Sequence, residues 1–136
     1  MVSVRYLVRD VEASIAFYTS HLGFALKQQF GPAMAILTRG DLSLWLAGPM
    51  ASAARPMPDG RTPEPGGWNR IVLEVQDLPA IAAEMREAGA RFRNEIVTGV
   101  GGKQILVEDP AGNPVELFQP LRDEARLGGT GEQRAG

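Results

Sequence analysis

The stretch VRYLVRDVEASIAFYTSHLGF, residues 4–24, is repeated in outline by RIVLEVQDLPAIAAEMREAGARF, residues 70–92. Each stretch begins with the apolar alternation of a strand and continues with apolar residues at helical spacing. Between the two patterns stands an aspartate, Asp10 or Asp77, a residue type that favours the N-cap of a helix. The sequence therefore predicts the same strand–helix pair twice.

Three short runs of strand composition follow each predicted helix. They are FALKQQF, AMAILTRG and LSLWLAGP in the first half, and RFRNEIV, KQILVED and PVELFQP in the second. Gly23 and Gly89 suit the left-handed position that ends a helix, and Gly99 to Gly102 are expected to form a loop between strands. Each half is thus predicted to be a βαβββ unit, which gives an α+β fold.

The repeat also predicts how the chain is divided. The first module spans residues 1–49 and the second spans residues 70–121. Between them, residues 50–69 are rich in proline and glycine and are expected to form an extended linker with no regular element. Residues 122–136 combine charge and glycine without an apolar period, so a flexible tail is expected there.

Composition excludes several classes of function. A formal charge of −2 and a pI near 5.4 provide no basic field for nucleic acid. No apolar run has the length of a signal peptide or membrane span, so we expect a cytoplasmic protein with no membrane partner. The absence of cysteine excludes thiolate chemistry and cysteine-based metal sites. The single histidine, His21, lies where a predicted helix ends, and a structural role at the helix dipole is favoured.

The repeated stretches at residues 4–24 and 70–92, together with VEDPAGNPVELFQP at residues 107–120, resemble sequences of the vicinal oxygen chelate superfamily. That superfamily includes glyoxalase I, extradiol dioxygenases, fosfomycin-resistance enzymes and bleomycin-resistance proteins. The resemblance covers both halves of the chain. It implies two βαβββ modules that curl into a half-open mixed sheet, a concave cleft, and a homodimer.

The resemblance further implies four metal-ligating positions, one on the first and one on the last strand of each module. The matching residues are Ser3 and Trp45 in the first module, and Arg70 and Glu116 in the second. Indole and guanidinium offer no lone pair to a metal, and serine is a poor ligand. Beside Arg70, the Glu116 carboxylate should form an ion pair more readily than a metal site. We therefore expect neither a metal nor another cofactor.

Strand alternation predicts which side chains face the cleft. An indole, a phenyl ring and guanidinium groups suit a planar ligand. Two alternatives stay open: Trp45 is core packing, or Glu116 belongs to a strand-end pattern held by Arg70 or by water. The expected ligand-binding residues are Ser3, Arg5, Ser43, Trp45, Arg70, Val72, Glu116 and Phe118.

Two functions remain open at this point. The first is a metal-independent binding protein that sequesters a planar aromatic natural product or antibiotic, as in self-resistance. The alternative is a glyoxalase-like or dioxygenase-like enzyme that acts on a small molecule in the same cleft, for example with Glu116 as a general base. The lack of cysteine and the single histidine favour binding. The near-neutral charge, with Arg5 and Arg70 in the cleft, favours a neutral or weakly anionic ligand over a cationic one.

Overall fold

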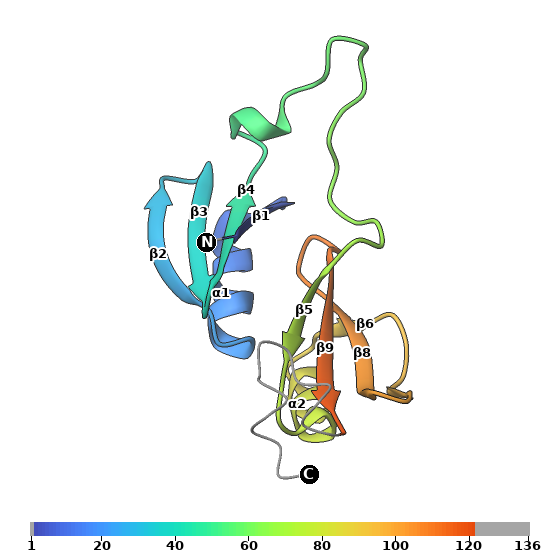
Figure 1. Ribbon diagram of the computed structural model, residues 1–136. Helices are drawn as coiled ribbons and strands as arrows, with labels where there is room; N and C mark the ends of the chain where they lie inside the picture. The colour runs from blue at the N-terminus through green and yellow to red at the C-terminus, as the bar shows by residue number, and fades with distance from the viewer. Residues whose placement is uncertain (1, 122–136) are drawn as a thin grey trace. The chain divides into compact units, whose positions relative to one another are not determined.

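The computed structural model describes residues 2–121, so the tail expected at 122–136 lies outside the described residues. Two compact units make up the chain (Figure 1). Of the described residues, the first unit contains 2–69 together with 109–113, and the second contains 70–108 and 114–121. The first unit is therefore not continuous in the sequence, because it takes in five residues that follow most of the second.

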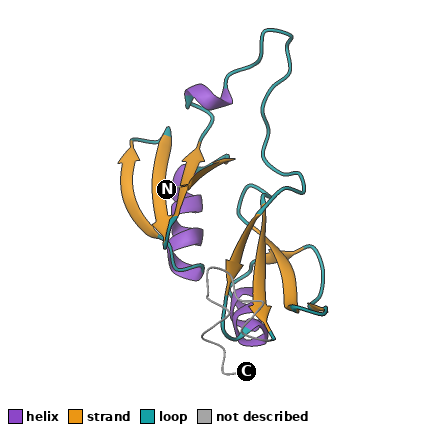
Figure 2. Cartoon of the chain, viewed as in Figure 1, coloured by secondary structure: helices purple, strands orange, loops and turns teal. Residues whose placement is uncertain are grey.

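The first unit contains a four-stranded mixed sheet and one long helix (Figure 2). Its sheet has the order β1-β4-β3-β2, in which only the β1–β4 pair is parallel. Helix α1 contacts β2, β3 and β4. The elements are β1 (Val2–Leu7), α1 (Val11–His21), β2 (Ala25–Phe30), β3 (Met34–Arg39) and β4 (Leu42–Ala47).

The second unit repeats this arrangement with one more strand. Its sheet has the order β5-β9-β8-β6, with β7 also paired to β8, and the β5–β9 pair is parallel. Its elements are β5 (Ile71–Glu74), α2 (Leu78–Glu87), β6 (Arg91–Phe92), β7 (Val97–Thr98), β8 (Gly102–Glu108) and β9 (Pro114–Pro120). Two helices and two mixed sheets, neither closed into a barrel within the described residues, confirm the predicted α+β class.

The ends of both long helices form as the sequence predicts. Asp10 accepts a hydrogen bond from the amide of Ala13 at 3.1 Å, and Asp77 accepts one from Ala80 at 3.2 Å. Gly23 and Gly89 follow the helices with φ angles of 73° and 92°. A left-handed residue costs glycine little, so it ends a helix readily.

Apolar alternation places a core between each sheet and its helix. In the first unit Leu37, Leu44 and Leu46 are fully buried, as is Tyr18 on α1. In the second unit the fully buried set is Ile105, Val107, Val115 and Leu117 from the sheet with Leu78 from α2. Residues at alternate positions in β1 and β4, or in β5 and β9, face away from the helix. We call these surfaces the open face of the first sheet and the open face of the second sheet.

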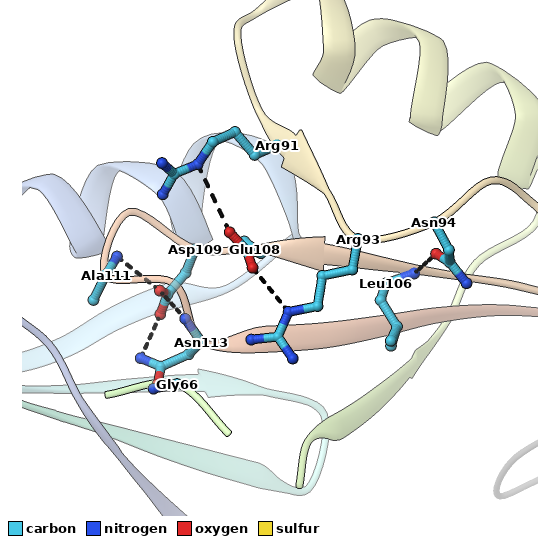
Figure 3. Close-up of polar contacts among 9 residues, drawn as sticks. All are labelled: Gly66, Arg91, Arg93, Asn94, Leu106, Glu108, Asp109, Ala111 and Asn113. Carbon is cyan, nitrogen blue, oxygen red and sulfur yellow. Dashed lines mark hydrogen bonds and ion pairs between the residues drawn. The ribbon is translucent and has the colours of Figure 1, made fainter. Parts of the chain in front are cut away.

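Two local features differ from the sequence prediction. The run RFRNEIV was expected to be one strand, but it forms two short pieces, β6 and β7. Between them the side-chain oxygen of Asn94 accepts a hydrogen bond from the amide of Leu106 at 2.9 Å (Figure 3). A side chain thus replaces a backbone acceptor and interrupts the ladder. Within the expected linker, Ser52–Ala54 forms one 3-10 turn, where no regular element was predicted.

No helix within residues 2–121 has the length and apolar character that crossing a membrane requires.

Candidate functional site: the open faces of the two sheets

The open face of the first sheet is organised around Trp45. This residue lies on β4, directly opposite Arg5 on the parallel strand β1. The guanidinium carbon of Arg5 stands over the indole, 4.9 Å from the ring centroid. The indole nitrogen donates a hydrogen bond of 3.0 Å to the hydroxyl of Ser43, which is 4% exposed. The half-buried ring is therefore fixed at its nitrogen and capped by a cation.

The strand register shows what surrounds this cation–indole pair. Ile36 on β3 is the partner of Trp45 on its other side, and Ser3 on β1 is opposite Ser43. Side chains directly opposite one another in a ladder point to the same face. Ile36 is half-buried and Ser3 is exposed, so the open face of the first sheet combines an apolar surface with accessible polar groups.

The open face of the second sheet is organised around an ion pair. Arg70 directly precedes β5, and its Nε and Nη2 atoms donate to the same oxygen of Glu116, Oε1, at 3.1 and 2.9 Å. The Glu116 side chain is 11% exposed and that of Arg70 is 31% exposed. The pair expected from the sequence is therefore present, and it is largely shielded from water.

Beside this pair lie the two apolar residues expected on the same face. Val72 is the register partner of Glu116 and is 41% exposed, whereas Phe118 is half-buried. The eight predicted residues thus fall into two groups. Ser3, Arg5, Ser43 and Trp45 belong to the first unit, and Arg70, Val72, Glu116 and Phe118 belong to the second. That both groups line one cleft stays a prediction.

The strand registers give Trp45 and Glu116 equivalent places. Trp45 pairs with Arg5, five residues before Asp10, and Glu116 pairs with Val72, five residues before Asp77. The two halves can therefore be compared position by position. At matching places one sheet carries an indole under a guanidinium, and the other carries a carboxylate bound by one.

The residues at the four metal-ligating positions do not fit a divalent ion. Ser3 is an exposed hydroxyl, Trp45 has no lone pair to give, and Arg70 is a permanent cation within 2.9 Å of the one carboxylate. A metal at Glu116 would have to displace Arg70 or withstand its charge. Across residues 2–121, histidine, aspartate and glutamate form no group of three or more that could hold a metal.

His21 lies in the last turn of α1, where the sequence places it. Its half-buried ring meets the ring of Phe17 edge to face, with 5.7 Å between the centroids. A histidine in this position interacts favourably with the C-terminal end of the helix dipole. Nothing in these contacts gives the imidazole a catalytic partner.

Sequence reasoning missed Asp109, the carboxylate that accepts the most hydrogen bonds within residues 2–121. It is 1% exposed and accepts hydrogen bonds from the hydroxyl of Tyr18 at 2.8 Å and from the amides of Ala111 and Asn113, both at 2.9 Å. Figure 3 shows Asp109 with the two turn residues. Burial, and then the charge and hydrogen bond of Asp109, raise the pKa of Tyr18 well above its ordinary value.

Asn113 extends this network within the first unit. Its side-chain nitrogen donates to the carbonyl of Leu7 at 2.7 Å and to Asp109 at 3.0 Å, and its oxygen accepts from the amide of Gly66 at 2.7 Å. Both polar atoms of the Asn113 side chain are thereby engaged, which is typical of a structural residue. The turn 109–113 therefore stabilises the fold. The sequence did contain one indication of this network: Tyr18 belongs to the apolar stripe of the first predicted helix, and a buried tyrosine hydroxyl needs a hydrogen-bond partner elsewhere in the fold.

A family model describes most of the chain. The model of the Glyoxalase/Bleomycin resistance protein/Dioxygenase superfamily matches residues 1–117. The chain belongs to this superfamily. The assignment agrees with the expected family and with the two-unit fold, and it leaves the choice between binding and catalysis open.

Several solved structures have the same fold as this chain. TnmS3, an antibiotic binding protein from Streptomyces sp. CB03234, is 27% identical, with 87% of this chain and 93% of that chain covered and a TM-score of 0.66. A superfamily member from Sphaerobacter thermophilus is 26% identical, with coverage of 86% and 94% and a TM-score of 0.68. Lactoylglutathione lyase from Agrobacterium tumefaciens, at 18% identity, coverage of 88% and 92% and a TM-score of 0.67, shares the fold.

A curated relative from Bacillus subtilis extends the similarity without adding a function. The uncharacterized protein YwbC is 28% identical over 116 residues, which cover 83% of this chain and 91% of that protein.

Proposed function

We propose that this protein is a metal-independent binding protein for a planar aromatic small molecule, held on the open face of the first sheet at Trp45. One observation carries the proposal: the carboxylate at the metal-ligating position of the second unit, Glu116, is bound by Arg70, and the equivalent place in the first unit is an indole. The guanidinium of Arg70 thus already pairs with the carboxylate that would otherwise attract a metal. An aromatic ring occupies the place of a ligand donor.

The similarity to TnmS3, an antibiotic binding protein, supports the same proposal independently of the site residues. At 27% identity over most of both chains, its described role makes antibiotic binding a reasonable role for this protein. A protein of this kind acts by holding a toxic planar compound away from its target, which requires affinity and no turnover. Sequestration of an antibiotic or related natural product is therefore the biological role that we propose.

The competing function is an enzyme that uses Glu116 as a general base. For that purpose the carboxylate would need a reactive oxygen near a substrate proton. In this chain Glu116 is 8% exposed, and its Oε1 already accepts two hydrogen bonds from the guanidinium of Arg70. We therefore favour binding over turnover.

We further propose that the protein is a cytoplasmic homodimer. Support for association comes from β2, which pairs only with β3 among the described strands and exposes Leu26 and Phe30 by 45% and 47%. An edge strand with exposed apolar residues is a favourable surface for pairing between chains. Light scattering at micromolar concentration tests this part, and a monomer would contradict it.

The test of the binding function combines metal analysis with ligand titration. The purified protein should contain no stoichiometric nickel, zinc, iron or manganese, and dialysis against a chelator should leave its affinity for planar aromatic compounds unchanged. Binding is followed by quenching of Trp45 in a Trp68→Phe variant, because Trp68 is 66% exposed and would contribute background emission. One tightly bound metal per chain, with loss of binding on chelation, would refute the proposal.

A further inference from the structure

Within residues 2–121 Arg5 forms no ion pair, unlike Arg70 on the open face of the second sheet and Arg93, which follows β6. Arg70 is bonded to Glu116, and Arg93 is bonded to Glu108 at 2.8 Å (Figure 3 shows the latter pair). Among the ion pairs between residues 2–121, none includes Arg5. The guanidinium is exposed, and its described contact is with the ring of Trp45. Its five N–H groups therefore remain available to an acceptor.

Within the first sheet, the neighbours of Arg5 on the open face do not compensate its charge. On β1, the residues two positions away on the same face are Ser3 and Leu7. Beside Trp45 on β4 stand Ser43 and Ala47, and across from it on β3 stands Ile36. All five side chains are neutral. A positive group on a neutral, partly apolar face attracts an anion.

The contact with the indole also prepares Arg5 for binding. An unattached arginine loses rotamer freedom when it binds a ligand, and this loss weakens binding. Here Trp45 already restrains the guanidinium, and the indole is restrained in turn by its hydrogen bond to Ser43. The planar fork of N–H groups matches a carboxylate, which can accept two parallel hydrogen bonds.

We infer that Arg5 determines ligand choice and that the ligand of the first sheet is an aromatic carboxylate. Its aryl group packs on the apolar surface around Trp45 and Ile36, while its carboxylate accepts hydrogen bonds from Arg5. This inference rests on the proposed binding function and narrows it from planar compounds in general to planar compounds that carry an anionic group. A cationic compound of equal size is excluded by the charge of Arg5.

The experiment compares two probes of the same shape, 2-naphthoate and 2-naphthamide, by isothermal titration calorimetry on the full chain. They differ in charge and in one acceptor oxygen that the amide replaces with an NH2 group. The naphthoate should bind up to about 10-fold more tightly, because a hydrogen bond between two charged groups is roughly twice as strong as one to a neutral acceptor. In Arg5→Gln the ratio of the naphthoate affinity to the naphthamide affinity should fall to about 1, since a neutral amide replaces the guanidinium. Arg5→Lys, which keeps the charge but loses the fork, should show an intermediate preference.

Arg55→Gln is the matched control, because Arg55 is an exposed arginine of the same unit that follows the 3-10 turn Ser52–Ala54 and lies outside the strands of the open face. It removes the same charge from the chain and should leave the preference unchanged. If Arg5→Gln fails to fold, as its melting temperature would show, Arg5→Lys decides. Equal binding of both probes, or a preference that survives at Arg5→Gln, overturns the inference and leaves the binding function standing. Failure of the folded native protein to bind either probe counts against the binding function itself.

Discussion

Tyr18 on the first helix donates a hydrogen bond of 2.8 Å to Asp109, which lies 91 positions later in the chain. Both side chains are almost completely buried, at 0% and 1% exposure. A buried carboxylate is stable only when its acceptor sites are filled, and this one has four donor contacts in addition to its burial. The contact therefore connects the helix of the first unit to the turn that completes the same unit.

Removing the Tyr18 hydroxyl should destabilise the protein. Tyr18→Phe leaves Asp109 without one donor in a site that water cannot reach, and we expect a loss of about 1 to 3 kcal/mol in the free energy of unfolding. Urea denaturation measures this loss. Asp109→Ala and the double variant complete a thermodynamic cycle, and purely additive losses would show that the two residues do not interact.

The same contact should make stability depend on alkaline pH. The pKa of Tyr18 is raised in the folded protein, so the unfolded chain loses its phenolic proton first. The stability that protonated Tyr18 contributes to the folded state is fully present below the ordinary tyrosine pKa of about 10, and it is lost as the pH rises above that value. Unfolding at a series of pH values should therefore show a steeper decline for the native protein than for Tyr18→Phe. Parallel curves would exclude Tyr18 as the titrating group.

Gly102 should tolerate no side chain. A Cβ atom there would overlap the carbonyl oxygen of Gln119 on the neighbouring strand, which belongs to the backbone and cannot rotate away. We expect Gly102→Ala to lower the free energy of unfolding by about 1 to 3 kcal/mol, the usual cost of overpacking. Gly99→Ala is the control, because its Cβ would have no neighbour closer than 3.9 Å. Equal melting temperatures for the two variants would contradict the close approach of β8 and β9.

The Arg70–Glu116 pair should contribute to stability more than a surface pair does. Arg70→Ala leaves a shielded carboxylate without its donor, and we expect a cost of about 1 to 3 kcal/mol. Arg61→Ala offers a comparison, since Arg61 and its partner Asp59 are 83% and 53% exposed and a pair of this kind is worth about 0 to 1 kcal/mol. Chemical denaturation of both variants measures the difference. A larger loss at Arg61 would mean that shielding of Glu116 has no energetic effect.

Trp45 should matter for binding more than for folding. Its ring is half-buried, so Trp45→Ala should cost less than the roughly 3 to 5 kcal/mol of a tryptophan in a core, while binding of 2-naphthoate should weaken by about 1 to 3 kcal/mol. Its neighbour Leu44 is fully buried on the opposite face, and Leu44→Ala should cost about 2 to 5 kcal/mol with little effect on affinity. A pronounced loss of stability at Trp45 without a loss of affinity would place the ring in the core.

Local features were the most predictable part of this fold. Asp10, Asp77, Gly23 and Gly89 act on residues within one turn of a helix, so their types alone indicate their roles. The Arg70–Glu116 pair was also foreseeable, because strand alternation and the repeat place both residues on one face. The broken strand at Asn94 was not, since its acceptor role depends on Leu106, twelve residues away.

The candidate site was predictable in membership but not in its contacts. Alternation placed Arg5 and Trp45 on one face, whereas the position of the guanidinium over the indole depends on the register of two parallel strands. The roles of Asp109 and Asn113 were hidden for a similar reason. Their partners Tyr18, Leu7 and Gly66 lie far away in the sequence, and no local pattern links them.

The non-continuous first unit limits how this protein can be divided. A polypeptide that ended at Asn69 would contain every strand and helix of that unit but not residues 109–113. The Tyr18 hydroxyl, the Leu7 carbonyl and the Gly66 amide would each lose a hydrogen-bond partner. The internal repeat thus describes two copies of one pattern, but the unit built on the first copy is complete only with five residues from later in the chain. In a ribosomal nascent chain, its last five residues emerge only after most of the second copy has been synthesised.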